Sequence, residues 1–260
     1  MTMQTITSTD GAPIAYWRGG SGPPLVLVHG SISDRTAWAL VQPTLERRFT
    51  VYTMHRRGRD GSAAGPHTMQ QEFEDIVGVV DAVGEPVHLA GHSFGAVCSV
   101  EAALLTSNLR SLVLYEPPTL GGAGARLVAG AAREFVRHGR GEDVIRTFLT
   151  QAIQLRSEEV GLIEQSPIWS QMVGHATSLA EELSASEDYR FDASRFVGLA
   201  IPVLLLAGAA SPREHLAVVD ALAKVLPNAT RRELPNERHM AMLSSPDLFV
   251  SELTSFIEKA

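Results

Sequence analysis

The most informative stretch of this sequence is residues 87–95, VHLAGHSFG. Its first part, Val87 to Ala90, is a short apolar run typical of a buried strand, and a segment of small residues with helical spacing begins near Ala96. Between them, residues 91–95 match the pattern Gly-x-Ser-x-Gly, in which a sharp strand-to-helix turn exposes a serine hydroxyl. We therefore predict that Ser93 is a nucleophile at a helix N-terminus, where the helix dipole favours developing negative charge.

Similar apolar runs bounded by glycine or proline recur along the chain, at Leu25 to Val28, Thr50 to Met54, Leu112 to Tyr115 and Val203 to Ala207. Longer segments with helical spacing separate these runs. This alternation predicts an α/β fold, a mostly parallel sheet flanked by helices on both faces. The leading segments Gln4 to Ser8 and Ile14 to Arg18 predict an antiparallel opening pair. In such folds ligands bind at the carboxyl ends of the strands, so we expect the site there.

The alternation stops after Tyr115, where Pro117, Pro118 and the glycine-rich residues 121–124 open a long helix-like segment. We predict that residues 119–201 form a helical cap inserted after strand six, and that residues 1–118 and 202–260 form the core. The cap carries enough apolar residues at helical spacing to pack onto the core and roof a pocket.

Composition describes a globular protein of 260 residues, 45% of them hydrophobic and 20% charged. The formal net charge is −7 and no Lys/Arg run occurs, so we expect a small-molecule substrate and neither nucleic acid nor a membrane as partner. Cys98 is the one cysteine, so no intramolecular disulfide can form. The N-terminal residues lack a signal-peptide pattern, and no apolar run approaches the roughly 20 residues that span a bilayer. We expect a cytoplasmic protein, and the sequence leaves its oligomeric state open.

The sequence also argues against a metal or cofactor. Nine histidines are present, but no His-Glu-x-x-His pattern or cysteine pair supplies metal-ligand spacing. Gly19-Gly20-Ser21-Gly22 precedes a strand and does not open a helix, which is unlike a P-loop or a dinucleotide fingerprint. We therefore expect neither a metal site nor a bound cofactor.

With these motifs the chain resembles the α/β-hydrolase family, in particular small bacterial esterases and haloperoxidase-like members with a helical cap. The resemblance covers nearly the whole chain outside the cap and rests on residues 19–24 (GGSGPP), residues 25–30 (LVLVHG), residues 56–59 (RRGR), the Ser93 turn and His239.

The resemblance implies that His29-Gly30-Ser31 is an oxyanion loop. The backbone N–H groups of Ser31 and Phe94 would then bind the carbonyl oxygen of a tetrahedral intermediate, and His29 would orient the loop. The resemblance also makes His239, which follows a predicted strand at Thr230 to Leu234, the general base.

The acid partner of His239 is less obvious, because family members commonly carry it after strand seven. At that place this chain has Ser211, which cannot stabilise an imidazolium with a full negative charge. Glu116, directly after strand six, is the natural replacement, and some family members, including certain haloalkane dehalogenases, place their acid at that strand end. The alternatives are that Glu116 only bonds backbone at the cap entrance, or that the acid is absent.

These residues predict a serine hydrolase that cleaves an ester or related acyl bond through a Ser93 acyl-enzyme, without a cofactor. A serine nucleophile argues against a dehalogenase or an epoxide hydrolase, which use an aspartate. The same residues would serve C–C bond, lactone or thioester hydrolysis, or perhydrolysis. A non-catalytic member that binds a ligand in the same pocket is the alternative of a different class.

Overall fold

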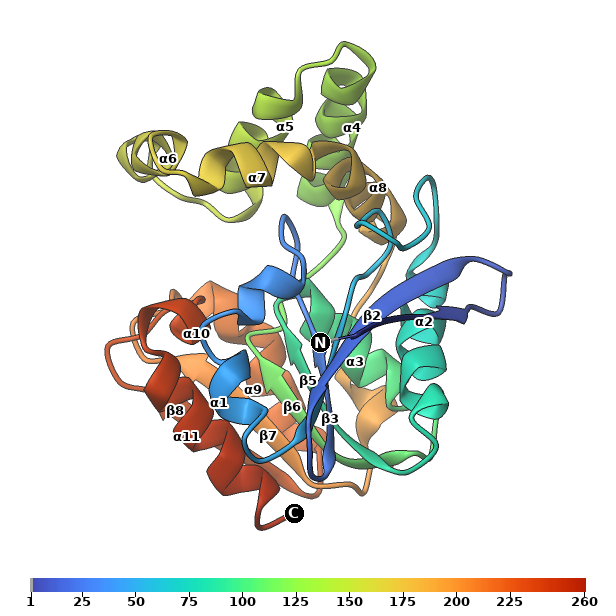
Figure 1. Ribbon diagram of the computed structural model, residues 1–260. Coiled ribbons are helices and arrows are strands. Elements are labelled where there is room, and N and C mark those ends of the chain that lie inside the picture. The colour runs from blue at the N-terminus through green and yellow to red at the C-terminus, as the bar shows by residue number, and fades with distance from the viewer. Residues whose placement is uncertain (1) are drawn as a thin grey trace.

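The computed structural model describes residues 2–260. In this part of the chain, eight strands form one sheet in the order β1-β2-β4-β3-β5-β6-β7-β8 (Figure 1). β1 pairs antiparallel with β2 and β2 with β4, and the other neighbouring pairs are parallel. The predicted α/β fold, a mostly parallel sheet with an antiparallel opening pair, is confirmed. The strands are β1 (Thr2–Thr7), β2 (Pro13–Gly20), β3 (Pro24–Val28), β4 (Thr50–Met54), β5 (Val87–His92), β6 (Leu109–Tyr115), β7 (Val203–Gly208) and β8 (Ala229–Leu234).

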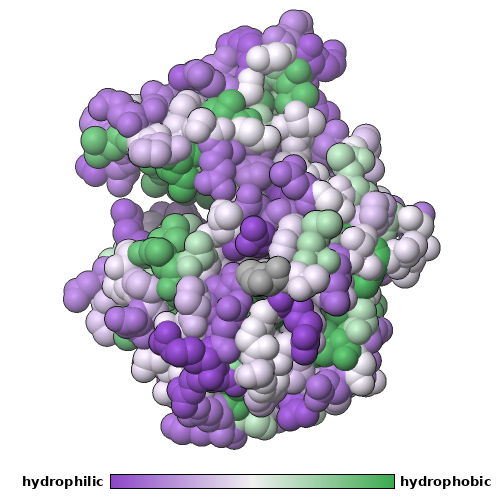
Figure 2. Space-filling model, in the orientation of Figure 1, coloured by the Kyte–Doolittle hydropathy of each residue, from purple (hydrophilic) through white to green (hydrophobic). Residues whose placement is uncertain are grey.

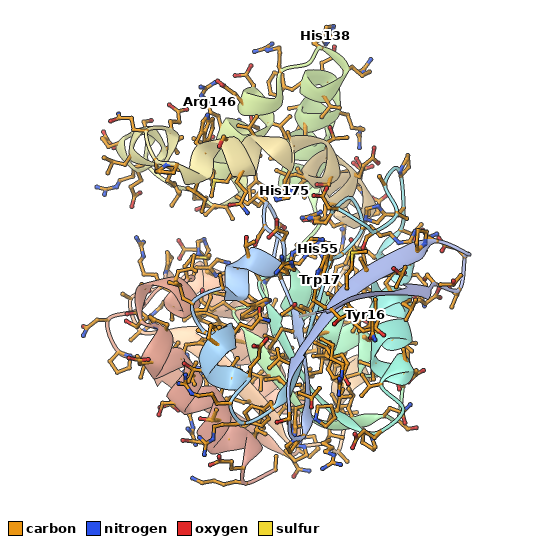
Figure 3. The ribbon with its side chains drawn as sticks, in the orientation of Figure 1. Tyr16, Trp17, His55, His138, Arg146 and His175 are labelled. Atoms are coloured by element: carbon orange, nitrogen blue, oxygen red, sulfur yellow. The ribbon has the colours of Figure 1, made fainter. Side chains whose placement is uncertain are left out.

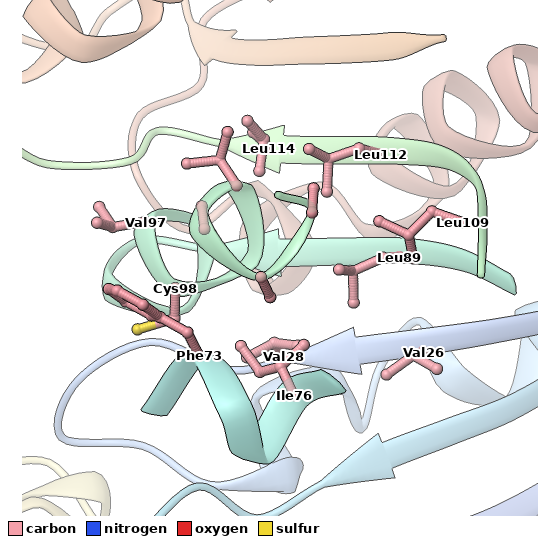
Figure 4. Packing of buried hydrophobic residues seen from close by; sticks show 14 of the residues in the cluster. Val26, Val28, Phe73, Ile76, Leu89, Val97, Cys98, Leu109, Leu112 and Leu114 are labelled. Atoms are coloured by element: carbon pink, nitrogen blue, oxygen red, sulfur yellow. The ribbon is translucent and has the colours of Figure 1, made fainter. Parts of the chain in front are cut away.

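Helices cover both faces of this sheet. One face packs against α2 (Met69–Ala82), α3 (Phe94–Ala102) and α9 (Ala217–Val225). Figure 4 shows part of this layer, with Phe73 of α2 and Val97 of α3 against the strands. The other face packs against η1 (Arg35–Trp38), α1 (Gln42–Leu45), α10 (Ala241–Ser244) and α11 (Pro246–Ile257). Two covered faces explain why the interior strands β3 and β7 are apolar at almost every position instead of alternating.

The helical insertion lies between β6 and β7 in sequence and forms a separate layer over the end of the core at which β6 stops (Figure 1). It has its own apolar cluster. On the face drawn in Figure 2 the surface is hollowed between this layer and the core. The insertion consists of α4 (Ala123–Arg137), α5 (Gly141–Thr147), the π-helical turn η2 (Phe148–Ala152), α6 (Ser157–Glu164), α7 (Ile168–Gly174) and α8 (Ala176–Ser186).

Polar contacts connect the insertion to the loop that follows β3. Gln171 of α7 donates from Nε2 to Oγ1 of Thr36 at 2.8 Å. His175, between α7 and α8, lies 3.6 Å from the carboxylate of Asp34. In Figure 3, His175 faces His55 and Trp17 of the core across this junction.

The chain returns to the core before β7. The short turn η3 (Ala193–Phe196) contacts α9, and Phe196 and Leu199 are buried in the cluster that contains α2 and α3. η4 (Arg213–Leu216) then leads from β7 into α9. None of the helices described is long and apolar enough to cross a membrane.

Candidate active site

Ser93 lies at the junction of β5 and α3. β5 runs to His92, two residues beyond the predicted end of the strand, because its pairing with β6 continues through Gly91 and His92. The backbone N–H of Ser93 donates to Tyr115 O at 2.9 Å. Ser93 then takes φ +55° and ψ −127°, a conformation rare for residues with a side chain, and α3 begins at Phe94. The turn therefore leaves the hydroxyl at the carboxyl end of the sheet, and the residue is 9% exposed.

The loop after β3 packs directly against this turn because two glycines allow a close approach. A Cβ built on Gly30 would lie 2.9 Å from Cβ of Ser93, and one built on Gly95 would lie 2.3 Å from His29 O. Real Cβ atoms essentially never come this close to other atoms. The glycines thus hold the predicted oxyanion loop beside the predicted nucleophile.

We expect Gly95→Ala to destabilise the protein, because the new methyl group would meet two backbone oxygens, His29 O at 2.3 Å and Val28 O at 2.8 Å. Overpacking of this kind costs about 3 kcal/mol in free energy of unfolding. The matched control is Gly130→Ala within α4, where a Cβ meets nothing within 4 Å. It should be neutral or stabilise by up to about 1 kcal/mol. Urea denaturation of both variants gives the comparison, and equal stabilities would contradict the close packing of the loop.

The peptide between Gly30 and Ser31 is held through its carbonyl. His29 is fully buried, and burial lowers the pKa of its imidazole well below the ordinary value, so the ring is neutral. Its Nε2 accepts from the backbone N–H of Arg56 at 3.2 Å, so the proton is on Nδ1, which donates to Gly30 O at 2.8 Å. In residues 2–260, neither the N–H of Ser31 nor that of Phe94 donates to another protein group. Both N–H groups can therefore bind a ligand oxygen.

His239 and Glu116 form a hydrogen-bonded pair. Nδ1 of His239 lies 2.7 Å from Oε2 of Glu116. The two residues come from loops 123 positions apart, after β8 and β6. The Glu116 side chain is 0% exposed and that of His239 is 30% exposed, so the carboxylate is hidden and the imidazole is accessible. In the neutral tautomer whose Nδ1–H donates to this carboxylate, Nε2 of His239 can accept a proton.

The surroundings of Glu116 favour the ionised carboxylate. Oε1 accepts from the backbone N–H of Gly208 at 2.7 Å and from the hydroxyl of Ser211 at 2.6 Å. Burial raises the pKa of Glu116, but the hydrogen bonds from His239, Ser211 and Gly208 outweigh it and lower the pKa below its ordinary value. Ser211, at the place where the family commonly has its acid, thus donates to the carboxylate of Glu116.

Two residues that sequence reasoning left without a role hold the backbone of the His239 loop. Nε2–H of the neutral, buried His92 donates to His239 O at 2.8 Å, and the two imidazole rings lie 4.6 Å apart. The hydroxyl of Tyr115 donates to Arg238 O and accepts from the N–H of Ala241 at 3.1 Å. Because His92 directly precedes Ser93, its contact brings the His239 loop to the turn. The sequence signal that could have identified His92 and Tyr115 is their position, because each directly precedes a predicted catalytic residue.

Two further residues, Trp38 and Cys98, are buried in the core. Trp38 is fully buried and packs beneath the site, its ring 6.4 Å from that of His92 and 6.1 Å from that of Phe249. Cys98 is buried on α3. Over the described residues, no group of three or more His, Cys, Asp or Glu side chains could hold a metal ion.

Comparison with known proteins identifies the family. A model described as "Alpha/beta hydrolase family" matches residues 25–252. The chain is 25% identical to (E)-2-((N-methylformamido)methylene)succinate hydrolase of Acinetobacter baylyi, over 99% of both chains. It is 28% identical over its whole length to polyketide synthase ThaQ of Burkholderia thailandensis, of which it spans only 13%.

A solved structure agrees with these matches. The crystal structure of an alpha/beta hydrolase from Sphaerobacter thermophilus DSM 20745 is 32% identical and has a TM-score of 0.88, covering 98% of this chain and 100% of that one. The chain therefore belongs to the alpha/beta hydrolase family.

Proposed function

We propose that this protein is a serine hydrolase that cleaves an ester or related acyl bond of a small molecule through a Ser93 acyl-enzyme. The observation that carries the proposal is the buried hydrogen bond from Nδ1–H of His239 to Glu116. This bond fixes the tautomer in which Nε2 can take the proton of Ser93. It also supplies the negative charge that stabilises the imidazolium once the proton has moved.

In the first half of the reaction, His239 accepts the proton of Ser93 as the hydroxyl oxygen attacks the acyl carbon. The N–H groups of Ser31 and Phe94 donate to the oxygen that becomes negative in the tetrahedral intermediate. His239 then gives the proton to the leaving group, and the acyl group remains on Ser93.

In the second half, His239 takes a proton from water, which attacks the acyl-enzyme through a second tetrahedral intermediate held by the same two donors. Collapse of this intermediate returns the proton to Ser93 and releases the acid. The mechanism requires no cofactor or metal. The same groups would open a lactone or cleave a thioester, and the walls of the pocket select among these substrates.

The decisive test is intact-mass analysis of the purified protein after treatment with a fluorophosphonate, a reagent that phosphonylates activated serines. We expect a single adduct that maps to the peptide carrying Ser93, together with hydrolysis of p-nitrophenyl acetate. An unlabelled and inactive protein would instead support a ligand-binding member of the fold. Labelling without ester hydrolysis would move the substrate class to lactones, thioesters or C–C bonds.

A further inference from the structure

A buried cluster of charged side chains lies behind the oxyanion loop and is not used in the mechanism above. Its members are Arg56 and Arg59 from the loop after β4, Glu72 of α2 and Glu182 of α8, and all four are at least 97% buried. Arg56 contacts Glu72 and Glu182, and Arg59 reaches the same Oε2 of Glu182 at 3.0 Å. Glu182 is the member contributed by the helical insertion.

Both arginines bind backbone carbonyls in the segment that follows β3, one within the oxyanion loop and one two residues beyond it. Nη1 of Arg56 donates to Gly30 O at 3.2 Å, beside the bond from His29. Nε of Arg59 donates to Ser33 O at 2.9 Å. The carbonyl of Gly30 and the N–H of Ser31 belong to one planar peptide group, so fixing the carbonyl also fixes the direction of the N–H.

Arg56 also contacts the second predicted donor. The guanidinium carbon of Arg56 lies 4.4 Å from the centre of the Phe94 ring, a cation–π contact. A single side chain therefore contacts the carbonyl of the peptide that carries the Ser31 N–H and the ring of Phe94. Burial opposes the charged form of Arg56, but Glu182 and Glu72 raise its pKa above the ordinary value. The two carboxylates therefore offset the cost of burying the Arg56 cation.

We infer that Arg56 is a positioning residue for the oxyanion hole, and that Glu182 of the helical insertion sets the place of Arg56. The inference rests on the proposed function, because it assigns these residues to the alignment of the Ser31 and Phe94 donors. It gives the insertion a role in catalysis besides covering the site. If α8 is displaced, Arg56 and Arg59 lose a shared partner and the loop loses two carbonyl anchors.

The test compares an ester with the matching thionoester, in which sulfur replaces the carbonyl oxygen. Negative charge on sulfur accepts N–H hydrogen bonds poorly, so the ratio of kcat/KM for the two substrates reports on the oxyanion donors. Loss of folded protein lowers both rates equally and leaves the ratio unchanged. The variants are Glu182→Gln, which removes the charge, and Arg56→Lys, which keeps a cation but loses the planar set of donors.

For both variants we expect kcat for the ester to fall about 10-fold to 100-fold, within the range for misplaced or lost oxyanion donors. The ratio of kcat/KM for the ester to that for the thionoester should also fall, and the KM for the ester should change little. The matched control is Glu181→Gln, the neighbouring carboxylate on α8, which makes no hydrogen bond or ion pair in residues 2–260. Its ratio should equal that of the wild type.

Different results would contradict the proposed function and this inference. A wild type that fluorophosphonate does not label would remove the proposed function and, with it, this inference. A labelled wild type whose two variants keep the wild-type ratio would overturn the inference alone, even if both rates fell through lost stability. Arg56→Lys makes the result independent of whether Glu182→Gln folds.

Discussion

Ser93→Ala should abolish esterase activity and fluorophosphonate labelling while leaving the fold intact. Removing the nucleophile of a serine hydrolase lowers kcat by about 10⁶-fold, because what remains comes only from the oxyanion donors and from binding. The Ser93 hydroxyl has no hydrogen-bond partner in residues 2–260. The free energy of unfolding should therefore change by no more than about 0.5 kcal/mol. Ester hydrolysis and urea denaturation measure the two effects.

A second variant, Ser93→Cys, tests the reactivity of residue 93 without knowledge of the substrate. Cys98, the one cysteine, is fully buried, so the wild type should resist iodoacetamide. In the proposed mechanism the side chain of residue 93 transfers its proton to His239, and an imidazole promotes the reactive thiolate of a Ser93→Cys variant. We expect one rapid alkylation at residue 93, slowed when His239→Ala is added. Retained hydrolysis in Ser93→Ala would place the nucleophile elsewhere.

The sheet could be predicted from the sequence because its evidence is local. Buried strands such as β3 and β7 are short apolar runs, and the turn at Ser93 has a five-residue pattern with a steric cause. The predicted strand ends two residues before β5 does, because the turn pattern begins at Gly91, whereas in the structure pairing with β6 continues through Gly91 and His92.

The contacts behind the site could not be predicted, because they join residues far apart in the chain. Arg56 and Glu182 are separated by 126 positions, and nothing in either local sequence indicates the other. The sequence predicts Tyr115 as the end of a strand, but its hydroxyl meets the backbone of residues 238 and 241 only because β6 and the His239 loop come together in the fold. The partner of Glu116 could be predicted because the resemblance already placed the base.

Glu116→Gln should lower kcat by about 10³-fold to 10⁴-fold, although the two side chains are nearly the same shape. Gly208 N–H and the Ser211 hydroxyl both donate to one oxygen of the present carboxylate. A glutamine must therefore place its carbonyl there and turn its NH₂ toward Nδ1 of His239. Nδ1 would then have to accept, which moves the imidazole proton to Nε2 and blocks proton transfer from Ser93. Steady-state kinetics with p-nitrophenyl acetate measures the loss.

Glu237→Gln is the matched control, because this carboxylate lies two residues from His239 but, within residues 2–260, bonds only the hydroxyls of Ser244 and Ser245. It should leave kcat unchanged. Activity in Glu116→Gln within about 10-fold of the wild type would mean that no acid is required or that another carboxylate serves, since losing the acid of such a triad costs far more.

A double variant that exchanges residues 116 and 211 tests whether the acid can act from either strand end. Because Ser211 lies 2.6 Å from Glu116, Glu116→Ser with Ser211→Asp moves the acid to the strand-seven position and should recover part of the activity.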